Sequence, residues 1–275
     1  MILIGIALAL FAAPVNTPST GGLLDQGYSA MYNLDFAAAH RHFQEWERLH
    51  PEDPFGPVSD AAAYLFFEFD RLKILRSEFF LQNRKFFSEK KPVPDAETKN
   101  GFEAALLKSK QLSAAMLQRD PNSERALFAN VMRIALHADY LALIEKQYWQ
   151  ALNEIKEARN DADELLVKFP NSKDAYLAAG VENYLLSQKV AGLRFFLRMT
   201  GAQTDKQTGV AKLRIVANEG HYLKPYAKIL LAIAALRDGN KAEATALITE
   251  LAHQFPANDL FRSEAAKFNC TANCD

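Results

Sequence analysis

Apolar residues recur at spacings of three and four along most of the chain, which places them on one face of an α-helix. One such stripe, in the segment DFAAAHRHFQEWERLH, consists of Phe36, Ala39, Phe43 and Trp46. Charged residues fill the positions between them, as expected for a helix with one face in water. No Asn-Gly or Asp-Gly pair joins two alternating, strand-like segments. The pattern therefore predicts an all-α protein.

Prolines and glycines divide this pattern into helices joined by short polar connections, which implies antiparallel neighbours. The predicted helices cover residues 22–33, 35–49, 58–88, 96–119, 123–148, 151–168, 173–187, 207–219, 224–238 and 240–254. We expect the long segment 58–88 to break around residues 76–79. Ser172 and Asn240 are expected to cap the helices that follow them, with Glu243 completing a capping-box arrangement with Asn240.

The chain divides into a short N-terminal segment, one long helical domain and a tail. The N-terminal segment covers residues 1–21, the helical domain residues 22–265 and the tail residues 266–275. Within the helical domain, residues 188–222 contain several glycines and are a candidate for an irregular insertion, with a further helix pair as the alternative.

A recurring proline-containing sequence marks the turns between the predicted helices. Pro51, Pro121, Pro170 and Pro256 occur in the stretches HPEDP, DPNSE, FPNSK and FPAND. Proline cannot continue a helix, so each site forces a turn into the next element. The interval between the first two prolines is close to two periods of about 34 residues, the length of a helix–turn–helix repeat. The other intervals do not fit that period, so the local pattern has to identify the repeat.

Small and large residues around these prolines follow a large-small-large order. The residues are Leu23, Gly27, Phe36, Ala39, Phe43 and Trp46 before Pro51, Leu231, Gly239, Ala244 and Leu251 before Pro256, and Tyr176, Ala179 and Gly180 after Pro170. Because of this alternation of large and small residues, the chain resembles the tetratricopeptide-repeat family over most of residues 22–256. It is also similar to exported bacterial members of unassigned function. The resemblance implies stacked antiparallel helix pairs in a right-handed superhelix, an α-α solenoid.

The resemblance also assigns roles to individual residues. Small residues let neighbouring helices approach, and large ones fill the space between helix pairs. The expected repeat-packing residues are Gly27, Ala39, Phe43, Trp46, Tyr176, Gly180 and Ala244. Arrays of this kind bind a protein or peptide partner in a concave groove formed by the first helix of each pair. The residues expected to bind a partner there are Arg125, Phe128, Met132, Arg133, Leu177, Val181 and Tyr184.

These groove residues do not reproduce the Lys, Asn and Arg set with which one subclass of the family binds a peptide carboxylate. The expected ligand is therefore an apolar or mixed segment of a protein, rather than a free C-terminus. Non-catalytic scaffolding is the function that the resemblance implies.

The first thirteen residues, MILIGIALALFAA, are apolar without interruption. Roughly twenty would be needed to span a bilayer, whereas this length suits a secretory signal peptide. A core helix at the N-terminus is the alternative. We expect export to the periplasm or cell envelope, where Cys270 and Cys274 could form a disulfide.

No motif for catalysis, phosphate binding or dinucleotide binding occurs in the sequence. We therefore expect no enzyme activity, no cofactor and no metal site. The net charge of −1 argues against a nucleic-acid partner.

A second hypothesis concerns the segment GLRFFLRM at residues 192–199. Arg194 and Arg198 bracket Phe195, Phe196 and Leu197, a combination suited to a membrane surface. In this alternative the protein is a membrane-peripheral assembly factor of the envelope, contacting lipid through residues 192–199 or through an uncleaved N-terminus.

Overall fold

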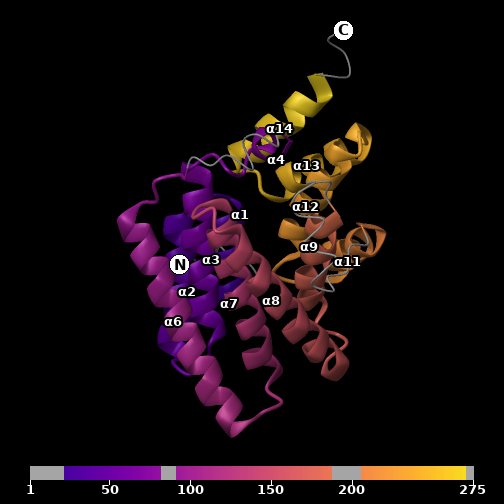
Figure 1. Ribbon diagram of the computed structural model, residues 1–275. Coiled ribbons are helices and arrows are strands. Elements are labelled where there is room, and N and C mark those ends of the chain that lie inside the picture. The colour runs from indigo at the N-terminus through magenta and orange to yellow at the C-terminus, as the bar shows by residue number, and fades with distance from the viewer. Residues whose placement is uncertain (1–21, 82–90, 188–205, 271–275) are drawn as a thin grey trace, which may run out of the picture.

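The computed structural model describes residues 22–81, 91–187 and 206–270, and every regular element in these ranges is helical (Figure 1). The elements are α1 (Leu23–Tyr32), α2 (Phe36–Leu49), α3 (Phe55–Arg71), α4 (Ser77–Leu81), α6 (Ala96–Arg119), α7 (Glu124–Leu143), α8 (Tyr148–Lys168), η1 (Lys173–Ala175), α9 (Tyr176–Ser187), α11 (Lys206–Glu219), α12 (Lys224–Arg237), α13 (Lys241–Gln254) and α14 (Asp259–Cys270). The predicted all-α class is confirmed for this part of the chain.

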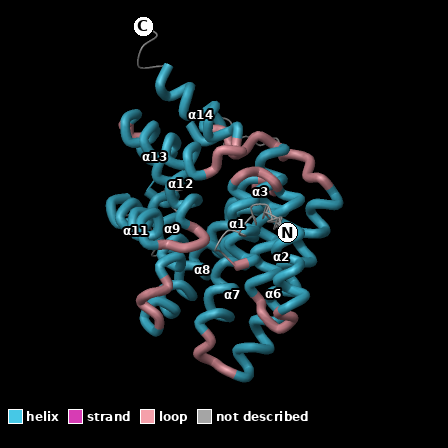
Figure 2. Tube along the Cα trace, turned by 180° about the vertical axis from the view of Figure 1, so that it is seen from behind, coloured by secondary structure: helices cyan, strands magenta, loops and turns pink. Residues whose placement is uncertain are grey.

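The long helices pack against their neighbours in sequence order. Contacts join α1 to α2, α2 to α3, α3 to α6, and then each long helix to the next as far as α14. Figure 2 shows that short loops connect most of these neighbours. This sequential packing is the arrangement expected of an α-solenoid.

The first pair illustrates how the sequence produces the contacts. The Asp35 side chain accepts a hydrogen bond from the Ala38 N–H at 3.0 Å and so caps α2. The predicted stripe on α2 is largely buried, and Ala39 and Phe43 have no exposed surface. The Phe43 ring lies directly beside Gly27 of α1, where any side chain would collide with it. Gly27 thus lets the ring of Phe43 approach the backbone of α1 closely.

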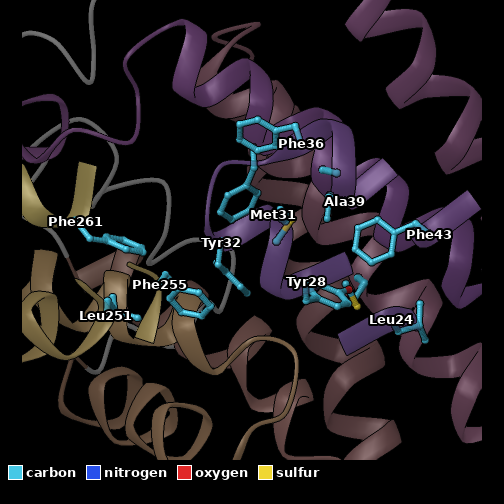
Figure 3. Packing of buried hydrophobic residues seen from close by; sticks show 14 of the residues in the cluster. Leu24, Tyr28, Met31, Tyr32, Phe36, Ala39, Phe43, Leu251, Phe255 and Phe261 are labelled. Atoms are coloured by element: carbon cyan, nitrogen blue, oxygen red, sulfur yellow. The ribbon is translucent and has the colours of Figure 1, made fainter. Parts of the chain in front are cut away.

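The two ends of the array meet. The side-chain amide of Asn258 donates to the carbonyl of Tyr32 at 2.7 Å, and the Ala257 N–H donates to Asn33 Oδ1 at 3.1 Å. Figure 3 shows the Tyr32 ring beside Phe255, and the ring centroids are 5.3 Å apart. Helix α1 is therefore held against the turn that joins α13 to α14. A linear array would leave this face of α1 in solvent.

Helix α7 lies among α3, α6 and α8. The stretch Glu124–Glu145 is long and apolar enough to cross a membrane, and half of its most apolar window is buried inside the protein. The apolar composition of α7 is explained by its central position, because residues of α7 belong to three of the buried clusters.

Several predicted boundaries are wrong. Helix α3 ends at Arg71, and the break in segment 58–88 falls at residues 72–76, where Lys73 has φ +59°. The predicted helix 123–148 ends at Leu143, and α8 begins at Tyr148. The predicted helix 207–219 is confirmed as α11, and α14 continues to Cys270. Residues 1–21, 82–90, 188–205 and 271–275 lie outside the described residues, together with the predictions made for them.

One predicted cap is confirmed and one is wrong. Asn240 Oδ1 accepts from the Glu243 N–H at 3.1 Å, and Asn240 Nδ2 donates to the Glu243 carboxylate at 2.9 Å. The Ser172 hydroxyl instead donates to the Glu124 carboxylate of α7 and makes no cap. Ser172 therefore stands at the start of η1, but its side chain contacts α7 instead of capping η1.

Candidate functional site

Four of the residues predicted to bind a partner line a single apolar cavity. Phe128 and Met132 come from α7, and Leu177 and Val181 come from α9. The cavity has a volume of about 70 Å³ and is partly open, and residues of α1, α3, α8 and α12 complete its wall. We call it the α7–α9 cavity. These four side chains, from two helices, therefore share one cavity wall.

A second apolar cavity lies beside the first. Its volume is about 90 Å³, and Phe69 of α3, Leu213 of α11 and Leu230 of α12 are part of its wall. We call it the α11–α12 cavity. The two cavities share the wall residues Asp139, Ile155, Val181 and Tyr226.

Asp139 is the charged member of this shared wall. Met132, Leu136 and Asp139 are spaced by four and three residues on α7, so they share one helix face. All three line the α7–α9 cavity. The Tyr226 hydroxyl donates to Asp139 Oδ2 at 3.2 Å. Although Asp139 keeps a partly exposed surface, burial among apolar side chains raises its pKa to about 7, and the Tyr226 hydrogen bond only partly opposes this.

Asp174 is a second carboxylate at the α7–α9 cavity, and its oxygens are satisfied by the backbone. It accepts hydrogen bonds from the N–H groups of His221, Tyr222 and Leu223 at 2.9, 2.8 and 3.3 Å. Burial raises the pKa of Asp174, and these three donors lower it in part. The carboxylate thus fixes the turn that begins α12, the helix that carries Tyr226.

Arg125 does not reach the predicted groove. Its Nη2 donates to Asp53 Oδ2 at 2.8 Å, and its guanidinium lies 4.2 Å from the centre of the Phe55 ring. Burial disfavours its positive charge, but the hydrogen bonds to Asp53 outweigh this and raise the pKa of Arg125. The side chain therefore joins α7 to the turn between α2 and α3.

Arg133 is likewise paired within the protein, here with a residue of its own helix α7. Its Nε and Nη2 donate to Asn130 Oδ1 at 3.2 and 2.9 Å, and burial lowers its pKa. Neither arginine belongs to the wall of the two cavities. The expectation that Arg125 and Arg133 would join the other groove residues is wrong. Tyr184 lies in α9, but its side chain is outside the described part of the structure.

The predicted repeat-packing residues lie at contacts between helices. Ala39 and Ala244 are fully buried, and Tyr176 packs at the edge of the cluster formed with α11 and α12. A Cβ on Gly180 would lie 2.9 Å from Leu213 Cδ2, so the glycine permits α9 to approach α11. Trp46 is half-buried, and its Nε1 donates to Asp53 Oδ2 at 2.9 Å. Cys270 is the last residue of α14, and Cys274 lies outside the described residues.

Within the described ranges, no three His, Cys, Asp or Glu side chains lie close enough together to hold a metal ion. Three described histidines are each paired with a single carboxylate, and His221 Nε2 lies 2.5 Å from Asp25 Oδ1. His40 Nδ1 lies 2.5 Å from Asp60 Oδ1, and His137 Nδ1 lies 2.7 Å from Glu154 Oε2. The cavities offer apolar surface together with three charged side chains: Asp139 in the shared wall, Asp174 in the α7–α9 cavity and Arg237 in the α11–α12 cavity.

Comparison with protein-family models finds none that matches the chain. Comparisons with curated proteins and with solved structures likewise find no match. The site is therefore interpreted from its own geometry.

Sequence reasoning missed Asp139 and Tyr226. The available signal was the stretch IALHADYLALI, in which Asp139 interrupts an otherwise apolar helix face. Ionised carboxylates are rarely buried without a partner, so a lone acidic residue on such a face is informative. Its partner Tyr226 lies on α12, far away in sequence, and only the fold brings the two together.

Proposed function

We propose that the protein is a non-catalytic helical-repeat scaffold that binds a protein partner. An apolar segment of the partner enters the α7–α9 cavity. The observation that supports this proposal is the convergence of Phe128, Met132, Leu177 and Val181 on one partly open apolar wall. Burying apolar side chains of a partner against such a wall provides the main driving force for binding.

We further propose that the helix pairs are tetratricopeptide repeats arranged in a right-handed superhelix. The contact between Gly27 and Phe43 supports this proposal, because it places a small residue of one helix against a large residue of the next. Ala244 of α13, fully buried after the left-handed Gly239, is the corresponding small residue near the C-terminus.

The non-catalytic part of the proposal rests on the sequence, in which no catalytic motif occurs. Export to the periplasm or cell envelope rests on the apolar residues 1–13. The lipid-binding alternative rests on residues 192–199 or on the N-terminus, and both segments lie outside the described residues. No structural observation therefore favours that alternative over a protein partner.

A matched pair of valine substitutions tests the proposal. Val181 lies in the wall shared by both cavities, so Val181→Trp places a large ring in the cavity space. Val167→Trp changes an 85% exposed position on α8. Each variant is used for a crosslinking pull-down from the native envelope, after circular dichroism has shown that it is folded. We expect the Val181 variant to lose a partner that the wild type and the Val167 variant both capture. Equal capture by all three proteins would refute the proposal.

A further inference from the structure

We propose that the shared wall of the two cavities is a binding site for an aliphatic ammonium group. The –NH₃⁺ group lies on the Asp139 carboxylate, and the alkyl chain lies in the apolar cavities. This inference rests on the proposed function, since it concerns the same cavity and names the chemistry of the group that enters it.

The first argument is the incomplete environment of Asp139. Two other poorly exposed carboxylates have stronger partners: Glu68 pairs with Arg71 at 2.7 Å, and Asp174 accepts three backbone N–H groups. Asp139 has the neutral Tyr226 hydroxyl, and no ion pair joins it to another described residue. A carboxylate has room for about four hydrogen bonds, and a charge in apolar surroundings is costly until it is paired. A cationic ligand would supply the missing partner.

The second argument is the composition of the walls on either side of Asp139. Ile155 and Val181 belong to both cavities, and the Tyr226 ring lies 5.4 Å from the Phe66 ring. Aliphatic side chains suit the methylenes of a ligand, and aromatic faces attract an ammonium group. The ligand is thus bound along its whole length, by apolar contact at the chain and by charge at the head.

The third argument is volume. Each cavity, at about 70 or 90 Å³, is smaller than the roughly 150 Å³ that accommodates a benzene ring. Two small spaces that meet at one carboxylate favour an unbranched chain over a ring. A primary alkylamine and the side chain of lysine share this chemistry.

The test compares two ligands that differ in charge and share the same alkyl chain. Titration calorimetry on the full chain measures the binding of n-hexylammonium chloride and of n-hexanol. We expect n-hexylammonium to bind at least about tenfold more tightly, since hydrogen bonds to charged groups are the stronger kind. Asp139→Asn should abolish this preference, and Asp163→Asn, at a half-exposed position on α8, should preserve it. Equal binding of the two ligands to the wild type, or an unchanged preference in Asp139→Asn, would overturn the inference.

A second arm distinguishes a free amine from a lysine of the partner. Asp139→Asn is used in the same pull-down as the Val181 variant. This arm applies when calorimetry shows that Asp139→Asn no longer prefers n-hexylammonium. If this variant then fails to capture the partner, the ammonium group belongs to a lysine of the partner. If it still captures the partner, the ammonium group belongs to a free amine. If Val181→Trp leaves partner capture unchanged, the proposed function fails, while the calorimetry still decides the ammonium site.

Discussion

The ring of Phe43 occupies the space that a side chain at Gly27 would need. A Cβ built on Gly27 would lie 2.8 Å from Phe43 Cζ and nearer still to two other ring carbons. Phe43 is fully buried, so the ring has no free volume into which it could turn. The approach of α1 to α2 therefore depends on the absence of this one methyl group.

Gly27→Ala should lower the free energy of unfolding by roughly 1–3 kcal/mol, the usual cost of overpacking a core. Urea denaturation measures this change. Phe43→Leu should reduce the cost of the alanine, because it removes the ring that the Cβ meets. Gly22→Ala is the control, since the nearest atom to its Cβ lies 3.8 Å away. Additive effects of the two core substitutions would show that Gly27 and Phe43 are not coupled.

Gly180 has the same relationship with Leu213 across α9 and α11. Gly180→Leu should lower the free energy of unfolding by roughly 1–3 kcal/mol, and Leu213→Ala in the same chain should restore part of the loss. Thermal and urea unfolding both report the change. A Gly180→Leu protein as stable as the wild type would show that α9 and α11 are not packed as described.

Asp174→Ala should destabilise the protein by roughly 1–3 kcal/mol, because it leaves three backbone N–H groups of the 221–223 turn without their acceptor. Amide hydrogen exchange should quicken at the start of α12. His221→Ala serves as a comparison, since its backbone N–H keeps the same acceptor. Unchanged exchange at residues 221–223 in Asp174→Ala would contradict the role assigned to this carboxylate.

Asp139 should make stability fall as the pH rises. Its pKa is about 7 in the folded protein against an ordinary value of 3.8 for an aspartate, so the folded state binds more protons between these pH values. The free energy of unfolding should therefore fall from about pH 4 to about pH 7, by at most about 1.4 kcal/mol per pH unit. Asp139→Asn lacks this contribution, so the difference between the two unfolding profiles isolates it. A difference that does not vary across this pH range would contradict the assignment.

The spacing of apolar residues and the positions of prolines and glycines predicted most helices, because both are local properties of the sequence. The stripe on α2 and the cap at Asn240 could be read from neighbouring residues, and both are found in the structure. Helix α14 was missed although Asn258, whose Oδ1 accepts from the N–H groups of Leu260 and Phe261, marks its start. That asparagine was interpreted only as part of a turn after Pro256.

Features that depend on distant contacts could not be predicted. The position of Arg125 on its helix was inferred, but Asp53, which binds it, lies 72 residues away. The same holds for the contact of Asn258 with Tyr32, which joins the two ends of the array. Helix register is local, so it could place Phe128 and Met132 on one face of α7, and Leu177 and Val181 on one face of α9.

Site-specific photocrosslinking tests the central claim most directly, namely that a protein partner contacts the α7–α9 cavity. The photoreactive residue p-benzoylphenylalanine replaces Phe128 in the cavity wall or, as a matched control, the 38% exposed Phe67 of α3. After irradiation in the native envelope, we predict a discrete protein adduct from position 128 and none from position 67. Equal adducts from both positions, or none from position 128, would contradict the account.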